Sequence, residues 1–268
     1  MAAARRASRL VIISENVNRI RSAVKGCGIA LSGEGWQCNG MSSTIPTGEP
    51  SRAQRTEAIL GRYFSPEIAE TLLNAEGPQP PRLVRTAVMF CDIRGFTAYS
   101  DGKPPCEVAA LLANYWEHIV VIASAQGGTV NKFIGDGALI LFGVPVEIPE
   151  PMAAAANVAL ALRQNLEKML KPYGLGLGIG LHYGDVIAGE IGFGERSEYT
   201  VIGGTVNLAS RLESLNKELG SRILLSEAAM NEVADQFQFR PLGGIPIRGL
   251  SQPVEVFELM GKLPSDGV

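Results

Sequence analysis

The chain has 268 residues, of which 46% are hydrophobic and 19% charged, and its formal net charge is −3. This composition is ordinary for a globular protein with a sizeable core, and the charge balance gives no indication of binding to nucleic acid or to an anionic surface. No uninterrupted apolar run approaches the roughly 18 residues that a membrane-spanning helix needs, so we expect no transmembrane segment.

The use of cysteine points to a reducing compartment. The chain has four cysteines and no C-x-x-C pair: Cys27, Cys38, Cys91 and Cys106. Cys91 lies in an apolar run that predicts a buried strand. We therefore interpret all four as reduced thiols of a cytoplasmic protein, and not as a disulfide framework or a zinc site.

The first 51 residues differ from the rest in composition. The first 33 residues contain six basic residues and a single acid, Glu15. This pattern is compatible with a targeting segment, with the remnant of an upstream regulatory domain or with a solvated tail. Residues 32–51 are rich in Gly, Ser, Pro and Thr and are typical of a linker. We assign residues 1–51 to a basic segment and linker.

A helical lead-in is predicted over residues 52–77, in two pieces. Ser65 and Pro66 form a good N-cap and first-turn pair, so the second piece should begin there and run to Gly77. A proline-rich stretch then separates this helix from the first strand.

The elements that follow alternate in a regular order. Periodicity and turn residues predict strands and helices with the following bounds. The strands are 83–91, 129–134, 138–142, 175–183, 186–191 and 199–202, and the helices are 107–125, 152–170, 205–219 and 226–234. We expect a hairpin turn at Gly184-Asp185. The order β-α-β-β-α-β predicts an α+β fold with a ferredoxin-like core, an antiparallel sheet with helices on one face, and extra C-terminal strands.

Two aspartates, 44 residues apart, stand in matching settings. Asp92 ends the apolar run AVMFCD, and Asp136 lies at the tip of the predicted hairpin in KFIGDGALILF. Each alone is a common cap or turn residue. The β-α-β-β order, however, places the first strand beside the hairpin, so both carboxylates should reach the same end of the sheet. Such a pair is suited to divalent cations, with the backbone carbonyl of Ile93 as a further ligand.

A second group of polar residues lies near these motifs. Lys132 precedes Asp136 by four residues, and the Thr200 hydroxyl can lie beside it. Asn207 and Arg211 are four residues apart and share one helix face. Residues of these types are also common on ordinary strands and surfaces. Arginine nevertheless offers a planar fork for a phosphoryl oxygen, and asparagine offers a donor and an acceptor for a sugar.

Three stretches together resemble a known family. FCDIRGFT, NKFIGDGALILF and EYTVIGGTVNLASRLE are similar, in order and separation, to the catalytic domain of class III nucleotidyl cyclases, the adenylate and guanylate cyclase family. The resemblance runs from about residue 82 to residue 259, and we assign residues 82–260 to this domain. It implies that Phe96 and Thr97, at the end of the first stretch, contact the substrate.

The resemblance also implies roles for the charged positions. Asp92 and Asp136 match the metal-binding aspartates, which hold two divalent cations, Mg²⁺ or Mn²⁺. Asn207 and Arg211 match the pair that orients the ribose and stabilises charge on the α-phosphate. A cation that grips the terminal phosphates has its nearest candidate in Arg248.

Nucleotide choice follows from another pair in this resemblance. Lys132 and Thr200 match the purine-selecting positions, and Lys with Thr is similar to adenylate cyclases, whereas Glu with Cys would be similar to guanylate cyclases. One departure from the family pattern is Gly204, where bacterial relatives commonly have Asp or another polar residue.

The expected protein is thus an adenylate cyclase that forms cyclic AMP and pyrophosphate from ATP. The resemblance implies a head-to-tail homodimer with two shared sites. In each site, one subunit provides the aspartates and the other the remaining side chains. The alternatives are a guanylate cyclase and a catalytically silent nucleotide-binding regulatory module. A ferredoxin-like RNA-binding domain is disfavoured because only 6% of residues are aromatic.

Overall fold

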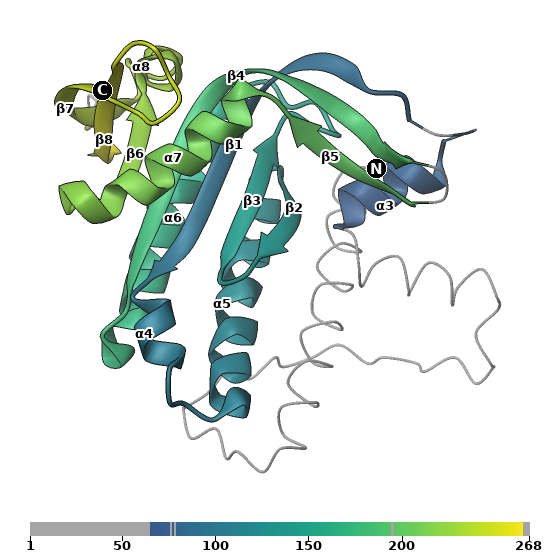
Figure 1. Ribbon diagram of the computed structural model, residues 1–268. Helices are drawn as coiled ribbons and strands as arrows, with labels where there is room; N and C mark the ends of the chain where they lie inside the picture. Colours follow the sequence, from purple (N-terminus) through teal and green to yellow (C-terminus); the bar gives the residue numbers. More distant parts are fainter. Residues whose placement is uncertain (1–64, 76, 78, 194–195, 265–268) are drawn as a thin grey trace.

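The computed structural model describes residues 65–75, 77, 79–193 and 196–264 (Figure 1). The basic segment, the linker, Cys27, Cys38 and the first piece of the helical lead-in lie outside these residues. The described elements, in chain order, are α3 (Pro66–Leu73), β1 (Arg82–Arg94), α4 (Phe96–Ser100), α5 (Pro105–Ala125), β2 (Gly128–Ile134), β3 (Gly137–Phe142), α6 (Pro151–Leu170), the 3₁₀ turn η1 (Lys171–Tyr173), β4 (Gly176–Phe193), β5 (Arg196–Ile202), α7 (Gly204–Leu219), β6 (Ile223–Ser226), α8 (Glu227–Asn231), β7 (Phe237–Ile245) and β8 (Val254–Lys262).

Within the described residues, eight strands form one sheet in the order β2-β3-β1-β4-β6-β8-β7, with β5 paired to β4. β1 lies between β3 and β4 and pairs with both in antiparallel register. The β-α-β-β-α-β order and the predicted fold class are therefore confirmed. β6 pairs with β4 in parallel, so the complete sheet is mixed.

Helices cover both faces of this sheet (Figure 1). α5 and α6 pack on one face, where Met89, Tyr115 and Leu162 are fully buried in the main core. α7 packs on the other face through the buried Ala209 and Leu212. The prediction of helices on one face thus holds for the two helices of the ferredoxin-like core. The later helix α7 lies on the opposite face.

β4 is a single strand of 18 residues, whereas the sequence predicts two strands and a turn. The turn prediction is wrong because Gly184 and Asp185 stay in the ladder, opposite Thr86 and Arg85 of β1. The glycine serves packing, since a Cβ atom at Gly184 would lie 2.8 Å from the Thr205 hydroxyl. That hydroxyl donates a hydrogen bond to the Asp185 carbonyl at 2.7 Å and anchors the first turn of α7.

Two helix ends also differ from their predicted positions. α3 begins as predicted, with the Ser65 hydroxyl accepting from the Ile68 amide at 3.4 Å, but it ends at Leu73. The glycine and prolines that follow in the sequence do not support further helix. α8 is shorter than predicted and ends at Asn231.

α5 is long and apolar enough, by length and composition, to cross a membrane. Among the described helices it passes this test with a mean hydropathy of 1.4 over 18 residues. The sequence of this helix is not an uninterrupted apolar run, because it contains polar residues such as Asn114 and Glu117. Its buried positions Leu111, Tyr115 and Ile119 belong to the main core, so core packing accounts for its apolar face.

The seat of α7 on β4 depends on glycine. A Cβ atom at Gly180 would overlap the carbonyl oxygen of Ala209 and the amide nitrogen of Glu213. Gly178, two residues earlier on the same face of the strand, would carry its Cβ atom 2.6 Å from a carboxylate oxygen of Glu213. Because these positions lack side chains, the helix lies directly on the strand backbone.

Gly180→Ala should therefore destabilise the protein, since the obstructing atoms belong to helix backbone that cannot move aside alone. We expect a loss of about 1–3 kcal/mol in the free energy of unfolding, measured by chemical denaturation. Gly261→Ala is the matched control, because nothing lies within 4 Å of its Cβ position. Equal stability of the two variants would contradict the close contact between the α7 backbone and Gly180.

His182 is a half-buried titratable group in the same strand. Its Nδ1 lies 2.6 Å from the hydroxyl of Ser226, the residue that caps α8. Burial lowers the pKa of His182 from 6.5 to about 4. The imidazole is therefore neutral in the folded protein at neutral pH, whereas the unfolded chain takes up a proton below about pH 6.5.

Acid should thus weaken the wild-type fold through His182. Between about pH 6.5 and pH 4 the unfolded state binds more protons, so the free energy of unfolding falls by at most about 1.4 kcal/mol per pH unit from this group. His182→Gln should remove this part of the pH dependence in denaturation curves taken from pH 7 to pH 4. The matched control is His118→Gln, and identical slopes in wild type and His182→Gln would refute the prediction.

Candidate functional site

Asp92 and Asp136 meet at one end of the β1–β3 pair. Asp92 lies two residues before the end of β1, and Asp136 lies in the turn between β2 and β3. Gly137 makes the approach possible, because a Cβ atom there would lie 3.2 Å from Oδ1 of Asp92 and 3.1 Å from the Cys91 carbonyl oxygen. The predicted convergence of the two carboxyl groups is present. Asp92 stands inside the strand, and not just after it as the apolar run suggested.

The environment of Asp92 opposes its negative charge. Burial, contact with the Asp136 carboxyl group and its charge, and the charge of Glu213 raise the pKa of Asp92 from 3.8 to about 8. Two carboxyl groups in contact resist simultaneous ionisation unless a cation neutralises them. The pair thus has the electrostatic character of a cation site.

The donor set fits a cation that is shared with a ligand. Within the described residues, no group of three or more His, Cys, Asp or Glu side chains is placed to hold a metal ion. Asp92, Asp136 and the backbone carbonyl of Ile93 would therefore be the protein's oxygen ligands. Mg²⁺ is commonly bound by one or two carboxylates together with water and substrate phosphates, so such a partial set is suitable.

Side-chain contacts link Lys132 and Asn131 of β2 to Glu198 and Thr200 of β5. The Lys132 ammonium lies 2.7 Å from a carboxylate oxygen of Glu198, and the Thr200 hydroxyl donates to the Asn131 side-chain oxygen at 3.3 Å. Asn131 in turn donates to the Tyr199 carbonyl at 3.0 Å. The register of β2 shifts between Val130 and Lys132, and such a bulge re-aims neighbouring side chains.

Asn207 and Arg211 lie on α7, as the spacing predicted. Asn207 is exposed and Arg211 is half-buried. The Arg211 guanidinium nitrogen lies 3.1 Å from the Cβ position of Gly249, in the loop between β7 and β8. The exposed Arg248 precedes that glycine in the same loop.

The rotation of α7 separates Arg211 from the aspartates of its own chain. Glu213 lies over Gly178, the residue opposite Asp92 in the β1–β4 ladder. Residues two apart in a helix point about 200° apart around the axis, so Arg211 faces nearly away from that position. The predicted charged and polar side chains therefore form three separate groups within one chain. These groups are the two aspartates, Lys132 with Thr200, and Asn207 with Arg211 on the outer face of α7.

Phe96 and Thr97 open α4, the short helix that follows β1. Gly95, in the left-handed region with φ of 82°, makes the turn into this helix. The amide groups of a first helical turn have no acceptor within the helix, so they are available to a ligand. Phe96 is half-buried and Thr97 is exposed.

Sequence reasoning missed three residues that contact or face these groups. Asn131 and Glu198 hold the Lys132–Thr200 pair, and Glu213 faces the aspartates. All three lie inside or next to the quoted motifs. Their partners, however, are set by the bulge in β2 and by the seat of α7, which local patterns do not reveal.

Comparisons with known proteins agree on one family. The pattern of the family described as "Adenylate and Guanylate cyclase catalytic domain" matches residues 79–261. "Adenylate cyclase 1" of Rhizobium meliloti (strain 1021) is 36% identical over 179 residues, which are 65% of this chain and 27% of that protein. The chain spans between 27% and 38% of the length of curated relatives that it matches.

Solved structures of both nucleotide specificities are similar to this one. The crystal structure of the adenylyl cyclase CyaB from P. aeruginosa has 30% identity and a TM-score of 0.64, and the match covers 70% of this chain and 100% of that one. The guanylate cyclase domain of RhGC from Catenaria anguillulae, in complex with GTP, has 26% identity and a TM-score of 0.60, and the match covers 68% and 100%.

Proposed function

Because the chain belongs to the adenylate and guanylate cyclase catalytic-domain family, we propose that it is an adenylate cyclase, which converts ATP to 3′,5′-cyclic AMP and pyrophosphate. The observation that carries the choice of ATP is that Lys132 on β2 and Thr200 on β5 lie on strands linked by the Lys132–Glu198 and Thr200–Asn131 contacts. An ammonium group only donates, which suits the N1 acceptor of adenine, and a hydroxyl can accept from the N6 amino group. Guanine presents an N1–H donor where lysine needs an acceptor.

The cation site assigned to Asp92 and Asp136 serves the phosphate end of the substrate. When bound, Mg²⁺ or Mn²⁺ ions would polarise the ribose 3′-hydroxyl and neutralise charge on the triphosphate. The two carboxylates and the Ile93 carbonyl hold this charge at the end of β1. The first-turn amides of α4, at Phe96 and Thr97, offer hydrogen bonds to phosphate oxygens beside it.

The remaining groups act on the reacting atoms. Asn207 orients the ribose, so that its 3′-oxygen is directed at the α-phosphorus. As that oxygen bonds to the phosphorus and the bond to pyrophosphate breaks, Arg211 stabilises the charge that develops on the α-phosphate. Arg248, the residue before the glycine that Arg211 approaches, is the candidate for contact with the terminal phosphates.

A head-to-tail homodimer would bring these groups into one site. In a single chain, Arg211 faces away from Asp92, so a second subunit must provide the guanidinium to each pair of aspartates. Large apolar side chains are exposed on the elements that would meet it: Ile134 on β2, Phe193 at the end of β4 and Ile202 on β5. Their exposed fractions are 52%, 95% and 50%, and exposed apolar side chains of this size are typical of a surface that binds a partner.

A cytoplasmic location is part of the same proposal. Cys91 and Cys106 are free thiols in the described part of the chain, which is typical of a reducing compartment. Cys91 is fully buried under Asp92, and burial raises its pKa to about 12. It therefore stays a thiol and packs as a small apolar residue.

Purified protein supplied with Mn²⁺ should form cyclic AMP from ATP with a kcat/KM at least about tenfold above that for GTP. Lys132→Met should lower kcat/KM for ATP by about tenfold or more, because the donor to N1 is lost, and leave the GTP value unchanged. Lys217→Met, at an exposed position of α7, is the matched control. Preferential cyclisation of GTP would overturn the adenylate assignment, and the absence of any cyclic product would overturn the enzyme assignment.

Mixing two inactive variants should restore activity if the site is shared. Asp92→Ala lacks a cation ligand, and Arg211→Ala lacks the guanidinium, yet each heterodimer has one site with both groups intact. With random exchange of subunits, the mixture should reach about a quarter of wild-type activity. A mixture no more active than its components, with both variants folded and dimeric, would exclude the shared site.

A further inference from the structure

Glu213 occupies a position beside the cation site that none of the roles above uses. Asp92 and Gly178 are directly opposite in the antiparallel β1–β4 ladder, so their side-chain positions lie on the same face of the sheet. The Glu213 carboxylate reaches down from α7 and lies 2.6 Å from the Cβ position of Gly178. It thus fills the place of the missing side chain next to Asp92.

Arg94 enters the same place from the other side. Its Nε lies 3.3 Å from the Cβ position of Gly178, and this nitrogen is buried without a hydrogen-bond acceptor. Its guanidinium NH2 group donates to the Ser221 carbonyl. Arg94 and Glu213 therefore bring opposite charges close to the same glycine. Asp92 lies two residues before Arg94 on β1.

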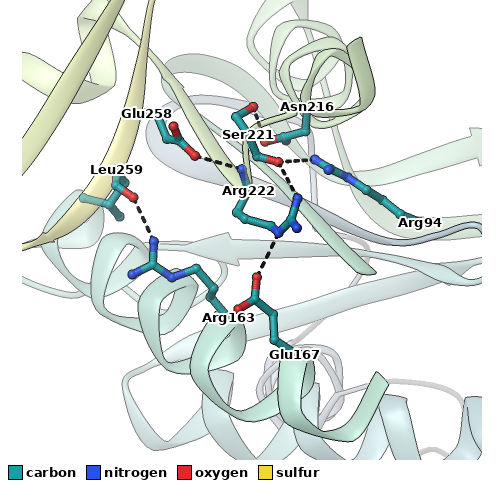
Figure 2. A network of polar contacts seen from close by, with 8 residues as sticks. All are labelled: Arg94, Arg163, Glu167, Asn216, Ser221, Arg222, Glu258 and Leu259. Atoms are coloured by element: carbon teal, nitrogen blue, oxygen red, sulfur yellow. Dashed lines mark hydrogen bonds and ion pairs between the residues drawn. The ribbon is translucent and has the colours of Figure 1, made fainter. Parts of the chain in front are cut away.

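The network in Figure 2 holds Arg94 in place. The hydroxyl of Ser221 donates to the Asn216 side-chain oxygen at 3.0 Å, and the amide group of Asn216 donates to the Ile179 carbonyl at 2.8 Å. Arg222 extends the network to Glu167 and Glu258. Asn216 and Ser221 are buried, so the Arg94 guanidinium is tied to a rigid part of the fold.

The carboxyl groups around Gly178 and Asp92 outnumber the positively charged groups beside them. Asp92, Asp136 and Glu213 are three carboxyl groups within electrostatic reach of one another, and Arg94 is the cation among them. Burial raises the pKa of Glu213, while the hydroxyl of Ser214 and the charge of Arg94 act in the opposite direction. Half-buried charges are screened less than exposed ones, so the charge of Glu213 is felt at Asp92.

We propose that Glu213 is a third carboxylate of the cation site, outside the ligand set, which strengthens cation binding at Asp92 and Asp136. The positive charge of Arg94, on the other side of Gly178, favours the ionised form of this carboxylate. The inference rests on the cation site in the proposed function. Removing a partner outside the ligand set of a metal site typically costs tenfold or more in affinity, which sets the size of the expected effect.

The test measures Mn²⁺ binding directly, by electron paramagnetic resonance of free Mn²⁺ titrated with the nucleotide-free protein. Glu213→Gln keeps the shape of the side chain and removes its charge, so the Kd for Mn²⁺ should rise by about tenfold. Glu213→Asp keeps the charge and should bind more tightly than Glu213→Gln. Glu218→Gln, on an exposed position of the same helix, should bind as the wild type does.

The outcomes separate this inference from the proposed function. If the wild type binds Mn²⁺ no better than Asp136→Asn, the cation site itself is wrong and the role of Glu213 falls with it. If the wild type binds Mn²⁺ and Glu213→Gln binds equally well, only the role of Glu213 is overturned. A purely structural role predicts that Glu213→Asp, which shortens the side chain, loses at least as much affinity as Glu213→Gln, and this result would also overturn the inference.

Discussion

The contact between α7 and the glycines of β4 determines how the chemical groups of this protein are arranged. Because Gly178 and Gly180 leave no side chains between helix and strand, the rotation of α7 is fixed by backbone contact. Leu212 then turns into the core, Glu213 toward Asp92, and Arg211 outward. One helix thus directs a carboxylate toward the sheet of its own chain and a guanidinium group away from that sheet.

Much of the core was predictable because local pattern and tertiary packing agree there. The apolar spacing of the helix 107–125 predicts one face formed by Val108, Leu111, Leu112, Tyr115 and Ile119. Leu111, Tyr115 and Ile119 are buried, and Val108 and Leu112 are half-buried. The meeting of Asp92 with Asp136 was also predictable, since strand order alone places β1 beside β3. Neither conclusion requires knowledge of distant loops.

Other features depend on contacts that the local sequence does not encode. Gly184-Asp185 has the composition of a turn, and only the Thr205 hydroxyl, 20 residues later, explains why glycine is needed in a continuous strand. Glu198 pairs with Lys132 because a bulge re-aims β2. The position of Glu213 beside Asp92 likewise depends on how α7 packs on β4, which the sequence motif around Glu213 does not reveal.

The unbroken course of β4 connects Thr200 to the residues that come just before β1. Thr200 is paired with Gly189 on this strand, and the backbone of Pro80 and Pro81 lies against the same glycine. The next residue, Glu190, exchanges hydrogen bonds with Gln79, at 2.9 and 2.8 Å. The residues before β1 are thus packed against the end of β4 that pairs with Thr200, whereas Asp92 lies toward the opposite end of the β1–β4 ladder.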